Sequence, residues 1–190
     1  MDDAGAVAAI VHAALHDKYA PALGAAALRG IAALTRWEVE DVPSSRHWVA
    51  EIDDRVAGVV HMAIGPAGGE GFCRALAGEV GWPRAVRATL VLSMLAHGRL
   101  GADEAYVEEL AVAEWARRRG VARALLAACE TEARRAERGR LTLWVTTNNT
   151  AARALYAGAD FRESRRRRWP VGRLPFRAPG PIPMARRPAP

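Results

Sequence analysis

The most informative part of the chain runs from Tyr106 to Leu126 and reads YVEELAVAEWARRRGVARALL. Its first part, Tyr106–Ala113, predicts a strand, and the apolar positions after Gly120 recur with the spacing of a long helix, expected to reach about residue 138. A short polar loop joins the two elements. The first turn of such a helix has backbone N–H groups without intrahelical partners, and the small Gly120 and Ala122 leave them uncovered. This arrangement predicts an anion site, although an ordinary helix start behind a solvated basic run would look similar.

A second informative run follows that helix. Leu141–Thr146 predicts another strand. The pattern Asn-x-x-Ala-x-x-x-Tyr then extends from Asn149 to Tyr156, within a short helix expected from about residue 149 to 157, and Phe161 comes five residues later.

Together the two runs resemble the signatures of the GNAT superfamily of N-acetyltransferases. The family motif Arg/Gln-x-x-Gly-x-Gly/Ala is matched by Arg117, Gly120 and Ala122. The second signature ends in a Gly-Phe pair in the family, where this chain has Asp160 before the phenylalanine. The resemblance is clearest over residues 105–162, and it implies one N-acetyltransferase domain over residues 1–190. It also implies an α/β (α+β) fold: a mixed, mostly antiparallel sheet, flanked by helices, with splayed central parallel strands.

The rest of the chain agrees with this order of elements. Apolar spacing predicts amphipathic helices before the first strands, and a tight turn is expected at Asp53-Asp54. The family's usual first strand is missing or very short, because helical spacing begins almost at the first residue. The remaining elements are expected as helices over 7–15, 21–37 and 84–97, and strands over 47–52, 55–64, 161–169 and 181–187.

Composition limits the class of protein. With 51% hydrophobic and 25% charged residues, the chain is ordinary for a globular protein. No apolar run approaches the roughly 20 residues of a membrane span, and the start Met1-Asp2-Asp3 lacks the basic region of a signal peptide. We therefore expect a cytoplasmic protein without a membrane partner. Cys73 and Cys129 give neither a disulfide framework nor a metal-ligand spacing. The five histidines show no metal spacing either, so no metal is expected.

The net charge of +6 raises the question of nucleic-acid binding. Lys18 is the only lysine, and the arginines are scattered along the chain. This skew is more typical of genome-wide codon bias than of a phosphate-binding face. Nucleic acid is therefore not the favoured partner, and Arg165–Arg168 is the run that would carry such an interaction.

The resemblance implies acetyl-CoA as cofactor, with its pantetheine arm between the strands at 106–113 and 141–146. A backbone N–H near Leu110 or Ala111 would polarise the thioester carbonyl. The resemblance assigns cofactor contacts to Leu110, Ala111, Val112, Arg117, Arg118, Arg119, Gly120, Val121, Ala122, Arg123, Asn149, Ala152 and Tyr156. For Asn149, capping of the helix that follows is the alternative reading.

Two side chains are candidates for proton transfer. Tyr156 is the candidate general acid toward the leaving thiolate, because a phenol stays protonated at neutral pH; a packing role in the core is the alternative. Glu108 is the candidate general base for the amine, or else a charge at a strand edge. On a regular strand Glu108 shares a face with Tyr106 and Leu110, and Glu109 points to the other face, toward solvent or a salt bridge.

The expected reaction moves an acetyl group from acetyl-CoA directly to a primary amine of a small molecule or peptide. Alternatives are transfer to a tRNA-linked or ribosomal-protein amine, and a non-catalytic acyl-CoA-binding module. The helix over 84–97 carries apolar side chains on most faces, so we expect it to cap the acceptor pocket or to form a homodimer contact.

Overall fold

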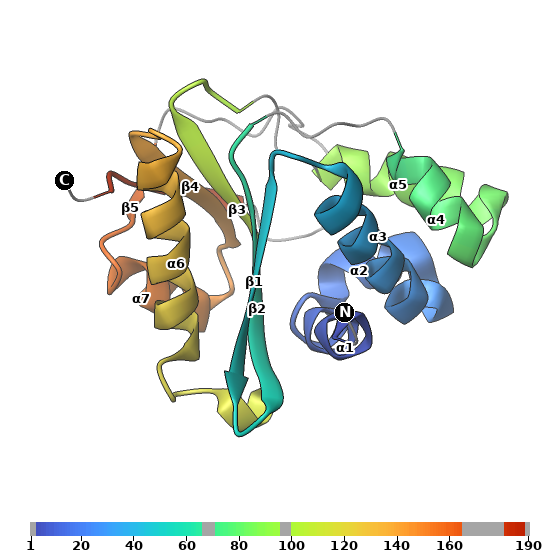
Figure 1. Ribbon diagram of the computed structural model, residues 1–190, viewed down its shortest axis with the longest axis horizontal. Coiled ribbons are helices and arrows are strands. Elements are labelled where there is room, and N and C mark those ends of the chain that lie inside the picture. Colours follow the sequence, from blue (N-terminus) through green and yellow to red (C-terminus); the bar gives the residue numbers. More distant parts are fainter. Residues whose placement is uncertain (1–2, 66–70, 96–99, 165–180, 189–190) are drawn as a thin grey trace.

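A six-stranded sheet lies at the centre of the molecule in the computed structural model, which describes residues 3–65, 71–95, 100–164 and 181–188 (Figure 1). The strand order is β1-β2-β3-β4-β6-β5, and only the central pair β3 and β4 is parallel. The predicted mixed, mostly antiparallel sheet is therefore confirmed. The strands are β1 Ser45–Ile52, β2 Arg55–Ala63, β3 Glu104–Val112, β4 Arg140–Thr146, β5 Arg162–Glu163 and β6 Pro181–Arg186.

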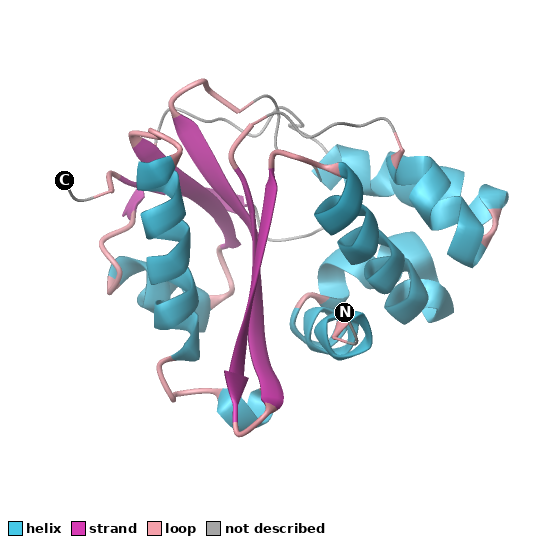
Figure 2. Cartoon of the chain, viewed as in Figure 1, coloured by secondary structure: helices cyan, strands magenta, loops and turns pink. Residues whose placement is uncertain are grey.

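Helices cover both faces of this sheet (Figures 1 and 2). On one face lie α1 to α3, with α4 and α5 farther from the sheet; α6 and α7 lie on the other face. The helices are α1 Ala4–Ala14, α2 His16–Leu23, α3 Ala27–Asp41, α4 Phe72–Val80, α5 Trp82–Leu95, α6 Val121–Arg135 and α7 Thr150–Ala157, with 3-10 turns at Gly24–Ala26 and Glu114–Ala116.

The sheet separates two hydrophobic cores. One joins α1 to α5 with the sheet through residues such as Leu23, Ile31 and Val59. The other joins α6 and α7 with the opposite face through residues such as Leu125 and Phe161. Strand β2 is buried along nearly all of its length and contributes side chains to both cores. This burial on both faces explains its near-continuous run of apolar residues.

The β1–β2 hairpin turns where the sequence predicts it. Asp53 and Asp54 have φ angles of 52° and 55°, the left-handed conformation that a two-residue hairpin turn requires and that Asp tolerates. The strands pair as Ile52 with Arg55 next to the turn, but a bulge at Ala50/Glu51 shifts the register by one residue beyond it. This shift decides which side chains face each other farther along the hairpin.

The two parallel strands separate, as the resemblance implies. Pairing between β3 and β4 runs from Glu104 opposite Arg140 to Val107 opposite Leu143, and goes no further. Beyond this point β3 continues to Val112 beside β2, and β4 continues to Thr146 beside β6. Backbone groups on the facing edges of the two strands are thus left without a sheet partner.

The N-terminal helices differ from the prediction. The helix expected over 21–37 is divided at Gly24, and Pro21 lies inside α2 instead of at the start of a helix. Gly24 has φ 56° and ψ −134°, which no helix accommodates. The predicted apolar stripe is nonetheless buried at Leu23, Ala27 and Ile31.

Other boundaries also need correction. Helix α6 ends at Arg135, and the left-handed residue after it is Glu137, so the predicted stop at Gly139 is wrong. Helix α4 was not expected. Within the described residues no strand precedes α1. Of the strand expected over 161–169, the described part contains β5, and residues 165–169 lie outside the described residues. The run Arg165–Arg168 lies outside the described residues.

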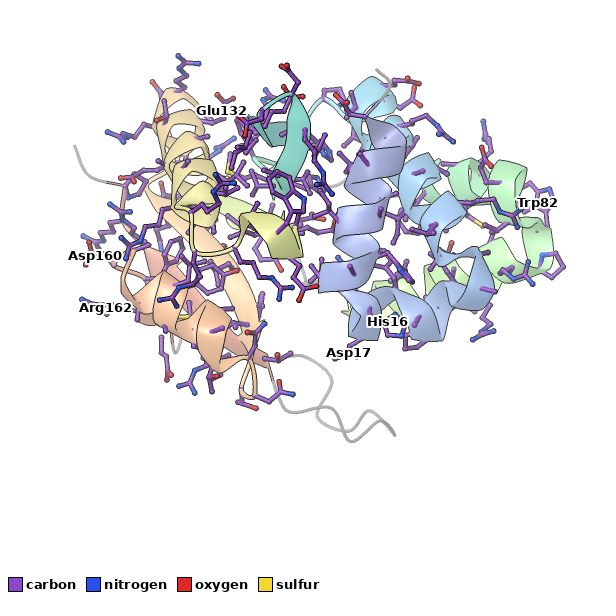
Figure 3. The ribbon with its side chains drawn as sticks, turned by 90° about the horizontal axis from the view of Figure 1, so that it is seen from below. His16, Asp17, Trp82, Glu132, Asp160 and Arg162 are labelled. Carbon is purple, nitrogen blue, oxygen red and sulfur yellow. The ribbon has the colours of Figure 1, made fainter. Side chains whose placement is uncertain are left out.

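Helix α5 has one buried face and one exposed face. Ala85, Ala88 and Leu92 are buried, and the helix packs mainly on α2 and α4. Trp82 and Leu90 are 60% and 64% exposed. Figure 3 shows Trp82 at the opposite end of the molecule from Asp160 and Arg162.

Candidate active site

The loop before α6 presents backbone donors to solvent. Gly120 is the N-cap of α6 with φ 85°, and the first helical hydrogen bond is donated by Ala124 N–H to the Gly120 carbonyl. The N–H groups of Val121, Ala122 and Arg123 precede that bond and have no acceptor within the helix. They form the positive end of a helix of 15 residues. This is the expected geometry of an anion site.

The surroundings of these donors are open and basic. A Cβ built on Gly120 would meet no atom within 4 Å, so a ligand can approach the backbone closely. Arg117, Arg118, Arg119 and Arg123 are all exposed. We call residues 117–120 the arginine loop. Together with the first turn of α6, it fits the diphosphate of coenzyme A in charge, in donor chemistry and in available space.

The side chains expected beside the cofactor on β3 divide between the two faces. Leu110 and Val112 pack with the core beneath α6, whereas Ala111 is buried in the core beneath α1. Only the backbone of Ala111 can therefore face a cofactor held between β3 and β4. Gly58 of β2 helps to seat α6 here, because a Cβ at this position would lie 2.9 Å from Val121 Cγ1.

Asn149 is placed as a helix cap. Its Oδ1 accepts a hydrogen bond of 3.0 Å from the Ala152 N–H, so the capping interpretation is confirmed for this side chain. The same bond fixes the start of α7 and, one turn later, the position of Tyr156.

Tyr156 lies inside the core between α7 and α6. Its ring packs against Phe161, with centroids 5.8 Å apart, and the residue is 8% exposed. Burial raises the pKa of Tyr156 to about 12, with a smaller contribution from Cys129. Tyr156 is thus a protonated donor at neutral pH. Burial likewise raises the pKa of the Cys129 thiol to about 12, which leaves no thiolate for an acyl-cysteine route.

At two positions the chain departs from the family signatures but keeps the backbone conformation expected there. Asp160 has φ 61° and Arg118 has φ 64°, so both adopt the left-handed conformation that glycine would supply at these positions. Asp adopts this conformation more readily than most residues. The turn into Phe161 and the arginine loop are therefore formed without the glycines.

A bulge in β3 changes the orientation of Glu108 and Glu109. His61 pairs with Glu109 and Met62 pairs with Val107, so Glu108 is the extra residue. Consequently Val107 and Leu110 lie on the same face, toward α6. The predicted alternation, with Glu108 sharing a face with Leu110, does not hold across the bulge.

Glu109 points into the molecule, toward α2. Its carboxylate accepts hydrogen bonds from Lys18 Nζ at 2.6 Å and from the Tyr19 hydroxyl. The predicted salt bridge is confirmed, but the expectation of an exposed side chain is wrong, because only 12% of the Glu109 side chain is accessible.

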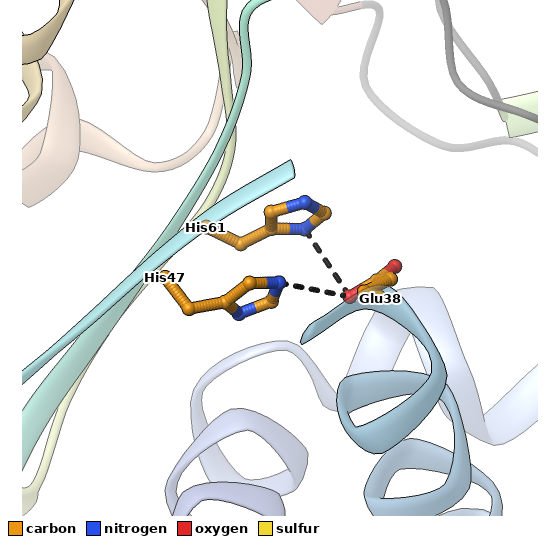
Figure 4. Close-up of side chains that lie close together, drawn as sticks. All are labelled: Glu38, His47 and His61. Carbon is orange, nitrogen blue, oxygen red and sulfur yellow. Dashed lines mark ion pairs between the residues drawn. The ribbon is translucent and has the colours of Figure 1, made fainter. Parts of the chain in front are cut away.

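Two histidines that the sequence did not single out complete a group of buried and half-buried polar side chains. His47 and His61 are register partners in the hairpin, and their rings stack with centroids 4.2 Å apart. The Ser45 hydroxyl lies 2.9 Å from Nε2 of His47 and 2.7 Å from Nε2 of His61. One carboxylate oxygen of Glu38 lies 3.5 Å from a nitrogen of each ring (Figure 4). Glu108 lies 3.6 Å from Nδ1 of His61.

We call this group the polar cluster. It contains Lys18, Tyr19, Glu38, Ser45, His47, His61, Glu108 and Glu109.

Burial sets the protonation of the cluster. It raises the pKa values of Glu38 and Glu108, and neighbouring carboxylates add to the effect at Glu38. Burial lowers the pKa of His47 to about 3 and that of His61 to about 4, so both imidazoles are neutral at pH 7. Burial opposes ionisation of Glu109 as well, but Lys18 outweighs it and lowers the pKa of this carboxyl.

The sequence contained only a weak signal for the histidine pair, namely that both histidines fall in the two strands of the predicted hairpin. Reflection about the Asp53-Asp54 turn would place His47 opposite Val60, and only the bulge at Ala50/Glu51 brings His47 opposite His61. Other acidic residues near the site in sequence stay apart from the cluster: Glu40, Asp41 and Asp103 are exposed, and Glu104 pairs with Arg140.

Known proteins give the context for this geometry. The family model described as the acetyltransferase (GNAT) family matches residues 12–161. In a search of curated proteins, no sequence matches the chain. Among the described residues, no helix is long and apolar enough to span a membrane.

Solved structures share the fold. A nourseothricin acetyltransferase is 24% identical over 79% of this chain and 69% of its own, with a TM-score of 0.52. A ribosomal-protein-alanine N-acetyltransferase from Brucella melitensis is 21% identical over 98% and 94% of the two chains, with a TM-score of 0.60. The PaiA N-acetyltransferase from Thermoplasma acidophilum, solved in complex with coenzyme A, is 10% identical over 98% and 93%, with a TM-score of 0.58. The chain is a transferase that belongs to the acetyltransferase (GNAT) family.

Proposed function

We propose that this protein transfers an acetyl group from acetyl-CoA to a primary amine of a small molecule or peptide, in a ternary complex of enzyme and both substrates. The observation that carries the proposal is the arginine loop. Its unpaired N–H groups begin α6 beside the point where β3 and β4 separate. A helix start of this kind binds phosphate, and the separated strands leave backbone groups for the amides of a pantetheine chain.

The backbone and the arginines of the chain would act on two parts of the reaction. The N–H groups of Val121, Ala122 and Arg123, aided by the neighbouring arginines, bind the diphosphate. Backbone N–H groups of β3 near Leu110 orient the carbonyl. Acetyl-CoA, when bound, supplies the activated acetyl group as a thioester.

Two side chains would move protons. Glu108, whose side chain is 30% exposed and whose pKa is raised by partial burial, accepts a proton from the incoming ammonium, directly or through water. The Tyr156 hydroxyl has no hydrogen-bond partner among the described residues. It is protonated and free to donate to the leaving sulfur.

The acceptor is best identified by a direct screen. Purified protein is mixed with acetyl-CoA and a panel of amines, and release of free thiol is followed. The panel contains nourseothricin, a ribosomal-protein peptide with N-terminal alanine, lysine and spermidine, in view of the fold neighbours and the three carboxylates near the site. Acceptor-dependent thiol release supports the proposal. Binding of acetyl-CoA without turnover for any amine would instead support an acyl-CoA-binding module.

A further inference from the structure

The polar cluster contains three ligand atoms of the kind that hold a transition metal. Glu38 comes from the last turns of α3, His47 from β1 and His61 from β2. One ligand atom from each residue lies within 4.8 Å of the other two. The three side chains converge from three elements, which fixes their spacing through the packing of α3 on the hairpin (Figure 4).

The distances suit ligands around an ion better than they suit direct hydrogen bonds. The Glu38 Oε2 atom is 3.5 Å from His47 Nε2 and 3.5 Å from His61 Nδ1. A good N–H···O hydrogen bond would be about 2.9 Å long. Two ligands of a tetrahedral zinc ion, each roughly 2.0–2.1 Å from the metal, stand about 3.3 Å apart. The two rings are stacked at an interplanar angle of 11°, so binding one ion also requires them to tilt until both nitrogen lone pairs point at it.

The carboxylates beside the three residues have few cationic partners. Lys18 pairs with Glu109 at 2.6 Å, and among the described residues no ion pair joins a lysine or arginine to Glu38 or Glu108. Among the ion pairs of the described residues, Glu38 has only the two imidazoles as partners.

From this geometry we propose that Glu38, His47 and His61 bind a divalent transition metal, with Zn²⁺ as the best-suited ion. Two imidazoles and one carboxylate form a three-ligand zinc set that leaves a fourth position for water. Glu108, 3.6 Å from His61 Nδ1, stands next to the ion. No metal-ligand spacing was recognisable in the sequence, because the three ligands lie 9 and 14 residues apart in the chain.

Ser45 supports the ligand role of His61. When Nδ1 of His61 binds the metal, its Nε2 carries the proton and donates it to Ser45 Oγ, 2.7 Å away. Nε2 of His47 would exchange its contact with the Ser45 hydroxyl for the ion. Neutral imidazole is the form that coordinates a metal ion.

The test is a titration of the metal-free protein with Zn²⁺, followed by calorimetry, and with Co²⁺, followed by visible absorption. We expect one equivalent per chain and the absorption of four-coordinate Co²⁺. His47→Gln and Glu38→Gln should each weaken binding at least about 100-fold. Glu38→Gln nearly preserves the side-chain volume, so it remains informative if a histidine variant folds poorly. Circular dichroism checks the fold of each variant.

The matched control removes another pair of neighbouring histidines. His12 and His16 have ring centroids 5.2 Å apart on α1 and α2. The double variant His12→Gln/His16→Gln should bind one equivalent as the unaltered chain does. Loss of binding in this control, equal binding in all variants, or no binding by the unaltered chain overturns the proposal.

The same experiment distinguishes a metal ion from a bound amine at the polar cluster. If the carboxylates of the cluster bind a polycationic amine instead, spermidine will raise the melting temperature while neither metal binds, and the metal assignment falls. The titration contains no acetyl-CoA, so its result does not depend on the proposed acetyl transfer.

Discussion

The arginine loop and the polar cluster differ in the groups that they offer to a ligand and in how the fold brings those groups together. The loop is continuous in sequence and exposed, and its proposed work is done by backbone N–H groups. The cluster is partly buried, and its side chains come from α2, α3, β1, β2 and β3. A site of the first kind tolerates Arg118 where the family has glycine, because the backbone conformation is kept. A site of the second kind depends on the identity and register of every side chain.

The largest expected effect is at the loop. Gly120→Glu places a bulky carboxylate beside the free N–H groups, where it repels phosphate and occupies the open space. We expect the rise in melting temperature caused by acetyl-CoA to disappear, and turnover to fall below detection. Differential scanning fluorimetry with acetyl-CoA measures this.

The control for this substitution is Gly24→Glu. Gly24 also has a positive φ and open space around it, but it lies between α2 and α3. This variant should keep the shift caused by acetyl-CoA, although its backbone is strained. An unchanged shift in Gly120→Glu would show that acetyl-CoA binds elsewhere, and the comparison of the arginine loop with the polar cluster would lose its basis.

The same contrast explains what the sequence could predict. The strand, loop and helix from Tyr106 to about Arg135 were predictable, because each signal is local: alternation, glycine, then a helical stripe. The hairpin turn at Asp53-Asp54 was local too. The two bulges were not, since neither Ala50/Glu51 nor Glu108 has a residue type that marks one. Both bulges act on the cluster, one by pairing His47 with His61 and the other by turning Glu108 and Glu109.

The next effect concerns Tyr156. Tyr156→Phe keeps the ring packed on Phe161 and removes only the hydroxyl, so turnover should fall about 100-fold with nearly unchanged affinity for acetyl-CoA. Steady-state kinetics and the acetyl-CoA shift separate the two quantities. Full activity in this variant would leave Tyr156 as a packing residue and would place the proton donor elsewhere.

A smaller effect is expected for Glu108→Gln. Turnover at pH 7 should fall roughly tenfold, less than for Tyr156, because water can also accept the proton of the amine. The deficit should shrink as pH rises toward the pKa of the amine, near 10.4, since more free amine is then present. Rates between pH 7 and 9.5 test this trend. A deficit that is constant with pH would assign Glu108 to positioning of the acceptor.

The smallest effect is on stability, at the ion pair that anchors the cluster to α2. Lys18→Gln removes the main cation beside Glu109, and should lower the melting temperature at pH 7 by roughly 3–6 °C. The sign of the pH dependence follows from the lowered pKa of Glu109: the stability it contributes is present above its ordinary value of 4.5 and is lost as pH falls through the lower folded value. The difference in melting temperature between the variant and the unaltered chain should therefore disappear at acid pH.

Arg36→Gln is the control, because the Arg36–Glu79 pair is 2.9 Å long but its side chains are 44% and 41% exposed, and such pairs contribute little. Equal losses in the two variants would show that the Lys18–Glu109 pair behaves as a surface pair. The cluster would then lack the buried character on which its contrast with the loop depends.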